Sequence, residues 1–122
     1  MATSKIILEN PAPKQLTVTN VNPLPDEVSS CTINAYKVGY IVNLSYVIAI
    51  GSGSRTDYVN LATIQDAAPS STVTGDTNFL ASGTTACKPQ IAISGTDAVF
   101  NFRFNGTGTF AGTLTYLAAS YN

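Results

Sequence analysis

One segment constrains the fold of this chain more than any other, residues 40–50, which read YIVNLSYVIAI. Every even position from Tyr40 to Ile50 is aliphatic or aromatic, whereas the odd positions include Asn43 and Ser45. Successive side chains of a β-strand point to opposite faces, so this alternation predicts a strand with an apolar face turned inward. The aliphatic residues Ile41 and Val47 indicate that the outer face is only partly solvated.

The same signal recurs along the chain, between turn-forming residues. Strands are predicted at Cys31–Val38, Tyr40–Ile50, Tyr58–Ile64, Gln90–Ser94, Ala98–Phe104 and Phe110–Tyr116. Turns are predicted at Lys37–Gly39, Gly95–Asp97 and Asn105–Gly108, and Gly39 can supply the positive φ that a tight hairpin needs. Two polar loops are predicted, an exposed one over Ser52–Asp57 and a long one over Gln65–Asn78 that includes at most one short strand.

No segment has the apolar spacing of a helix. Short strands with turns at this spacing predict an all-β fold, an antiparallel β-sandwich or jelly-roll-like barrel. The 122 residues are enough for one domain. Two Asn-Pro-X-Pro segments bracket residues 16–21, so residues 1–27 are predicted to be an N-terminal arm or linker and residues 28–122 the barrel.

Charged residues make up only 11% of the chain, and 16 Thr, 11 Ser and 10 Asn provide most of its polarity. The six Lys and Arg are scattered, so no basic stripe is available to neutralise nucleic-acid phosphates. The same scarcity argues against an anionic membrane surface, and no apolar run is long enough to span a bilayer. We therefore expect no nucleic-acid partner and no membrane insertion.

The chain has two cysteines, Cys31 and Cys87. They can form one disulfide, or they can be two buried thiols in a reducing compartment, which is the favoured interpretation. The N-terminus has neither an apolar h-region nor a small-residue cleavage site, so no secretory signal is expected.

Catalysis is not expected. The chain has no His, which removes the base of Ser-His-Asp and Cys-His mechanisms and the histidine ligands of zinc sites. Two cysteines cannot form a closed thiolate site, no phosphate-binding glycine loop precedes a helix, and no calcium loop is present. A pair of carboxylates, as in glycosidases, is the one catalytic arrangement left open, but the acidic residues fall mostly in predicted turns, where Asp is common. No metal or cofactor is expected.

Two loops carry the candidate binding residues. The first, Ser52–Tyr58, contains Arg55, Asp57 and Tyr58, and the second, Ser70–Phe79, contains Asp76 and Asn78. An aromatic face beside amide, carboxylate and guanidinium groups suits a sugar, whose apolar face stacks and whose hydroxyls form hydrogen bonds. The alternative is that both are ordinary solvated loops with aromatic residues anchored in the core.

The order of these features resembles the C-terminal head domain of receptor-binding and tail-fibre proteins of tailed bacteriophages. The resemblance spans about Cys31 to Asn122. It lies in the segments NAYKVGYIVNLSYVIAI, YVNLATIQDAAP, PQIAISGTDAVFNFRF and GTFAGTLTYLAASYN, which are similar to the strand and turn patterns of that family. The stretch before Cys31 is too short for the shoulder and neck regions that such proteins usually carry.

The resemblance implies a homotrimer of β-barrels in a virion made in the bacterial cytoplasm, which binds a host cell-surface saccharide or protein receptor without catalysis. A trimer would bury a strand face around its axis, and this would explain Ile41, Val47 and Val99 at outer positions. Two alternatives remain. One is a structural virion component, such as a capsid decoration or head-fibre protein, attached to other virion proteins through the N-terminal arm. The other is a carbohydrate-binding module, although the absence of Trp argues against it.

Overall fold

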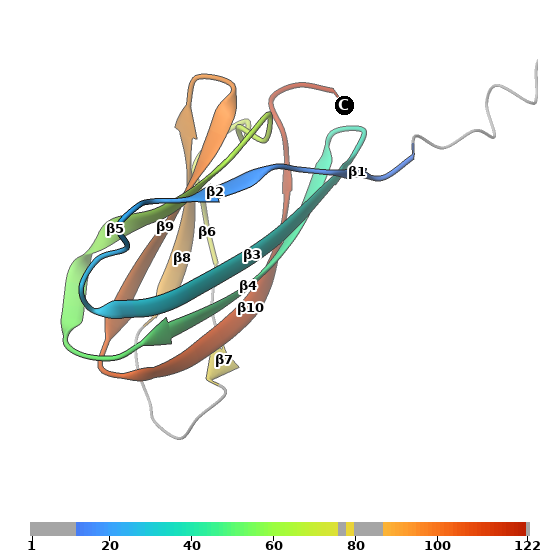
Figure 1. Ribbon diagram of the computed structural model, residues 1–122. Helices are drawn as coiled ribbons and strands as arrows, with labels where there is room; N and C mark the ends of the chain where they lie inside the picture. Colours follow the sequence, from blue (N-terminus) through green and yellow to red (C-terminus); the bar gives the residue numbers. More distant parts are fainter. Residues whose placement is uncertain (1–11, 76–77, 80–86, 122) are drawn as a thin grey trace, which may run out of the picture.

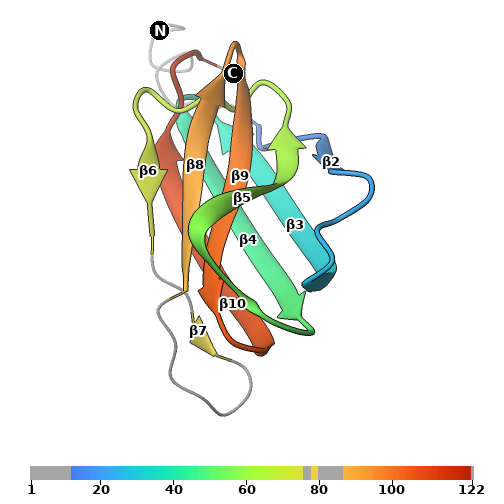
Figure 2. The same cartoon turned by 90° about the vertical axis from the view of Figure 1, so that its left-hand side faces the viewer.

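The computed structural model describes residues 12–75, 78–79 and 87–121. Two antiparallel sheets, each with five strands in these residues, lie face to face, as Figures 1 and 2 show from two sides. The predicted all-β antiparallel sandwich is therefore confirmed. No helix in the described residues is long and apolar enough to cross a membrane.

Each sheet combines long central strands with very short edge strands. Sheet A has the order β1 (Lys14–Gln15), β3 (Val28–Val38), β4 (Ile41–Ile50), β10 (Gly108–Leu117) and β7 (Asn78–Phe79). Sheet B has the order β2 (Val18–Asn20), β5 (Ser54–Ile64), β9 (Asp97–Asn105), β8 (Lys88–Ser94) and β6 (Val73–Thr74). Short edge strands expose few unpaired backbone groups, which limits pairing with other chains.

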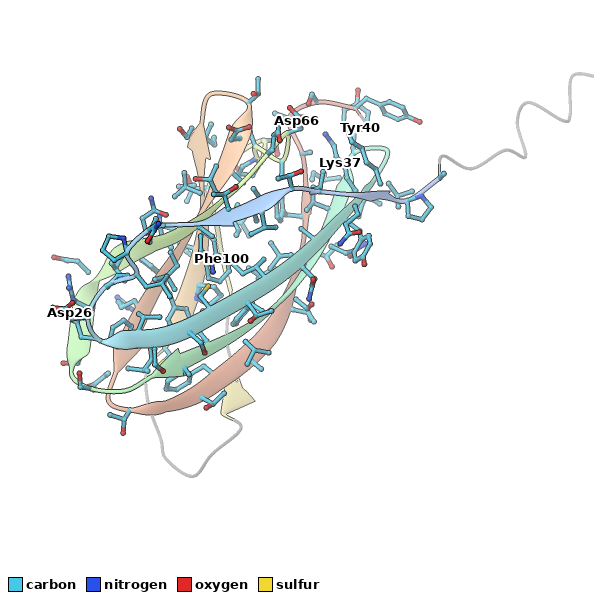
Figure 3. The ribbon with its side chains drawn as sticks, in the orientation of Figure 1. Asp26, Lys37, Tyr40, Asp66 and Phe100 are labelled. Atoms are coloured by element: carbon cyan, nitrogen blue, oxygen red, sulfur yellow. The ribbon has the colours of Figure 1, made fainter. Side chains whose placement is uncertain are left out.

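The core lies between the sheets and is formed by the predicted apolar rows. Ala98, Phe100, Phe102 and Phe104 of β9 are all buried, as are the even positions from Val42 to Ile50 of β4. Figure 3 shows Phe100 between the two layers. Its ring centroid lies 5.2 Å from that of Tyr46, so aromatic rings from both sheets meet at the centre of the sandwich.

The β3–β4 hairpin confirms the role of Gly39 and corrects the prediction for Tyr40. Gly39 has φ 62°, as the tight turn requires. Tyr40 is predicted to be the first of the inward-facing side chains of this strand. In the structure it lies in the turn, where side chains do not alternate between two faces, and it is 50% exposed. Ile41 and Val47 lie on the outer face as predicted, and in the single chain they are 45% and 42% exposed.

Two predicted boundaries in sheet B are wrong. The expected loop over Ser52–Asp57 is mostly strand, because β5 begins at Ser54, which is opposite Asn105 of β9. Register shifts between β5 and β9 allow the polar first part of β5 to pair with β9. Strand β8 begins at Lys88 and so includes Pro89, which lies opposite Phe102. The predicted loop over Gln65–Asn78 contains β6, in agreement with the expected short strand, but its last residue, Asn78, begins a second one, β7.

Part of the predicted N-terminal arm belongs to the sandwich. Strand β1 pairs with β3 in sheet A and β2 pairs with β5 in sheet B, so residues 14–20 pass from one sheet to the other. Leu16 between them is buried, and its backbone N–H donates to the Ala35 carbonyl at 2.9 Å. The edges of the two sheets are therefore linked directly along this side.

Candidate functional site

Arg55 of the first predicted loop already has a protein partner. Its guanidinium forms a two-pronged ion pair with the Glu27 carboxylate, in which Nη2 donates to Oε1 at 3.0 Å. The hydrogen bond from Arg55 lowers the pKa of Glu27, and the bond to Glu27 raises the pKa of Arg55. A ligand that used this guanidinium would compete with Glu27.

The other predicted residues do not converge with Arg55 on one site. Tyr58 is half-buried, and the guanidinium of Arg103 lies over its ring, with Cζ 5.4 Å from the ring centroid. Asp57 is exposed on β5. Asn78 lies on β7 opposite Ala111 of sheet A, on a strand that does not neighbour β5, and Asp76 lies outside the described residues.

A different surface gathers polar groups from three neighbouring strands. The outer face of sheet A contains a shallow depression of about 320 Å³ over β3, β4 and β10. It is lined by Asn34, Tyr36, Asn43, Leu44, Ser45, Thr113, Leu114 and Thr115. None of these side chains is charged, and Tyr36 is 44% exposed.

The strand register arranges the depression as two rows. In one row, Asn43 lies opposite Tyr36 of β3 and Thr115 of β10. In the next row, Ser45 lies between Asn34 and Thr113 in the same way. Direct neighbours on one sheet face have Cβ atoms about 5 Å apart, so each row presents adjacent side chains to one ligand.

One hydrogen bond orients the amide at the centre. Thr115 Oγ1 donates to Asn43 Oδ1 at 2.7 Å, so Asn43 presents its NH₂ group as a donor. Within the described residues no protein group accepts from this NH₂. The depression thus combines a fixed amide donor, several hydroxyls and one phenol ring, and it contains no carboxylate, thiol or amine that could act as an acid, base or nucleophile.

Two further depressions lie beside charged residues that form hydrogen bonds within the protein. Two shallow hollows of about 290 and 220 Å³ adjoin Gln65, where β5 ends. The Asp97 carboxylate there accepts from the backbone N–H of Asp66 at 3.0 Å, and the Asp66 carbonyl accepts from Lys37 Nζ at 3.0 Å. Figure 3 shows Lys37 and Asp66 at the same end of the sandwich. These contacts join sheet A to the loops of sheet B.

The described residues contain no group of three or more His, Cys, Asp or Glu side chains that could hold a metal ion. Cys31 and Cys87 are buried thiols that form no disulfide. Burial raises the pKa of the Cys31 thiol to about 11, which disfavours the reactive thiolate.

Comparison with known proteins adds no evidence on the function of this chain beyond its fold and the depression. No protein-family model, no curated protein sequence and no solved structure matches this chain.

Alternation in the sequence places Asn43 and Ser45 on an outer face, but it does not reveal the neighbours of that face. Thr115, which orients Asn43, lies 72 positions further along the chain. Only the adjacency of β4 and β10 brings the two together.

Proposed function

We propose that this chain is a non-catalytic binding domain that recognises a neutral saccharide with the depression on the outer face of sheet A. The row Tyr36–Asn43–Thr115 carries the proposal, because it places an aromatic ring, an oriented amide and a hydroxyl side by side. Sugars offer an apolar ring face for stacking and hydroxyls that both donate and accept. An uncharged lining suits an uncharged ligand, since no fixed charge is left to be desolvated.

We further propose that the ligand belongs to a host cell surface and that the domain acts in the virion of a tailed bacteriophage as part of its receptor-binding device. The resemblance of residues 31–122 to the head domains of such proteins supports this context. A protein receptor that presents amides and hydroxyls on a flat surface is the alternative ligand.

A homotrimer is part of this proposal, in a modified form. Ile41 and Val47 lie on the outer face of sheet A, whereas Val99 lies on the outer side of β9 in sheet B, so the three do not share one strand face. Cyclic assemblies use two different surfaces of each copy, which is compatible with this separation. Burial of the whole outer face of sheet A would close the depression, so self-association is proposed to use only part of that face.

The test is a binding screen with the full chain against neutral glycans, acidic glycans and whole bacterial cells. We expect binding to neutral glycans, with affinity reduced about tenfold by Tyr36→Ala, the equivalent of about 1.4 kcal/mol, and also reduced by Asn43→Ala. The matched controls are Arg55→Ala and Asp57→Ala, which change polar residues of sheet B. Loss of binding in the controls, with retention in the Tyr36 and Asn43 variants, would move the site to β5.

A further inference from the structure

Four exposed apolar residues gather at the end of sheet A that carries the β3–β4 turn. We call them the tyrosine patch: Tyr40, Ile41, Leu117 and Tyr121, which are 50%, 45%, 60% and 58% exposed. Clusters of this kind on a surface are typical of contact sites, because isolated exposed apolar side chains are common but adjacent ones are not.

The tyrosine patch is held in place by its own contacts. Ile41 and Leu117 lie directly opposite each other across β4 and β10. The rings of Tyr40 and Tyr121 meet edge to face, with centroids 5.1 Å apart and an interplanar angle of 71°. The backbone N–H of Ala118 donates to the Tyr40 carbonyl at 2.7 Å, which fixes the C-terminal segment against the turn. A partner would therefore meet a surface that is already ordered.

The described chain begins beside the tyrosine patch. Strand β1 pairs Lys14 with Lys37, and its antiparallel register places Ala12 level with Gly39, next to the turn that contains Tyr40. Figure 1 shows β1 running along β3 to this end of the sandwich, near the C-terminus. Eleven residues precede Ala12, and they contain one run of large aliphatic side chains, Ile6-Ile7-Leu8.

We propose that Ile6–Leu8 of one copy cover the tyrosine patch of a second copy. The four residues that follow Leu8 span at most about 14 Å to Ala12, so the aliphatic run is tethered close to the end of the sheet. To reach the patch of its own chain, the run would have to reverse direction within Glu9–Pro13 and then cross from β1 to β4. Asn10 and Ala12 each precede a proline, and a residue before proline favours an extended conformation, so a path that continues the direction of β1 past the end of its own sheet is favoured.

Each copy then covers the tyrosine patch of one neighbour with its own Ile6–Leu8, and its own patch is covered by the Ile6–Leu8 segment of a neighbour. This arrangement closes into a ring of two or more copies. The patch borders the row that contains Tyr36 but does not include it, so the saccharide depression stays open in the assembly. The inference rests on the self-association proposed above but not on saccharide binding. A monomeric native chain would remove both the homotrimer and this contact, whereas an oligomer that survives the loss of Ile6–Leu8 would remove this contact alone.

The experiment measures the mass of the full chain by light scattering over a range of micromolar concentrations. An arm variant carries Ile6→Ser, Ile7→Ser and Leu8→Ser, and a patch variant carries Ile41→Thr and Leu117→Thr. We expect the native chain to be an oligomer, each variant alone to be a monomer, and an equimolar mixture of the two to regain a complex. The mixture retains one native arm and one native patch, so it tests the contact between copies directly.

Ile93→Thr is the matched control, since Ile93 is 50% exposed at the end of β8 and should not alter the oligomer. A second measurement pairs Leu8→Cys in one chain with Leu117→Cys in another and looks for a disulfide-linked dimer on a non-reducing gel. A monomeric native chain, an arm variant that still associates, or a mixture that stays monomeric would each overturn the proposal. Circular dichroism of each variant verifies that the fold is intact.

Discussion

Gly112 of β10 lies directly opposite Tyr46 of β4, and a β-carbon at position 112 would lie 2.5 Å from the Tyr46 hydroxyl oxygen and 2.8 Å from the ring carbon that bears it. Tyr46 is almost fully buried and contacts the rings of Phe100 and Phe102, so its ring has little room to move. Glycine at this position therefore permits the largest side chain of β4 to fill the centre of the sandwich.

We expect Gly112→Ala to lower the free energy of unfolding by about 1–3 kcal/mol, the usual cost of overpacking a core. Urea denaturation followed by tyrosine fluorescence measures the change. Gly51→Ala is the matched control, because a β-carbon there would have its nearest neighbours at 4.0 Å, and it should leave stability nearly unchanged. Equal stability of the two variants would show that the Tyr46 ring can shift after all.

The central strands could be predicted from sequence because each carries its own alternation. Phe100, Phe102 and Phe104 are buried as predicted, and so is the row from Val42 to Ile50. The start of β5 could not be predicted, because Ser54 and Arg55 have no apolar alternation and become strand only by pairing with Asn105 and Phe104 of β9. Local pattern does not encode that pairing.

The candidate site was missed for a related reason. The sequence prediction favoured charged and aromatic residues in loops, whereas the depression is formed by uncharged residues in the middle of strands. Asn43 and Ser45 were placed correctly on an outer face, but their neighbours Tyr36 and Thr115 come from two other strands. The order of strands in a sheet is a property of the whole chain, so no local segment predicts the row.

Thr115 is expected to position the Asn43 amide for ligand binding. Thr115→Val keeps the shape of the side chain but removes the hydroxyl that donates to Asn43 Oδ1. Loss of one such hydrogen bond is worth about 0.5–1.5 kcal/mol, so glycan affinity should fall roughly 2- to 12-fold. Titration calorimetry measures the effect, and Thr115→Ser, which retains the hydroxyl, should bind nearly as well as the native chain. Unchanged affinity in the Val variant would remove Thr115 from the site.

Cys31 is expected to resist thiol reagents in the folded protein. Burial raises its pKa to about 11, so little thiolate is present at pH 8 and access is also restricted. We expect slow labelling by Ellman's reagent under native conditions and rapid labelling of two thiols per chain in denaturant, because neither cysteine is in a disulfide. Rapid native labelling of Cys31 would indicate that β3 opens readily. Cys31→Ala identifies which thiol reacts.

The ion pair between Arg55 and Glu27 predicts a pH-dependent contribution to stability. The pKa of Glu27 is lowered from its ordinary value of 4.5, chiefly by the hydrogen bond from Arg55. A lowered pKa in the folded state means that the contribution is present above the ordinary value and is lost as the pH falls through the lowered one. Native protein and Glu27→Gln should therefore differ slightly in melting temperature at pH 7 and converge in acid. Since both side chains are accessible to solvent, added salt should also reduce the difference.

Lys37 is the one buried charged residue in the described chain, and it predicts a distinction between two substitutions. Its methylene stem lies inside the sandwich, while Nζ reaches the backbone carbonyl of Asp66. Lys37→Ala removes both the stem and the hydrogen bond, and we expect it to lower the free energy of unfolding by about 2–4 kcal/mol, as large-to-small core changes do.

Lys37→Met keeps most of the apolar volume and loses only the ammonium, whose partner belongs to an exposed residue that water can reach. It should therefore cost less than half as much as the alanine change, because packing and not charge holds this end of the sandwich together. Urea denaturation of both variants measures the two costs. If methionine proves as damaging as alanine, the hydrogen bond to Asp66 is the dominant link between the sheets at this end.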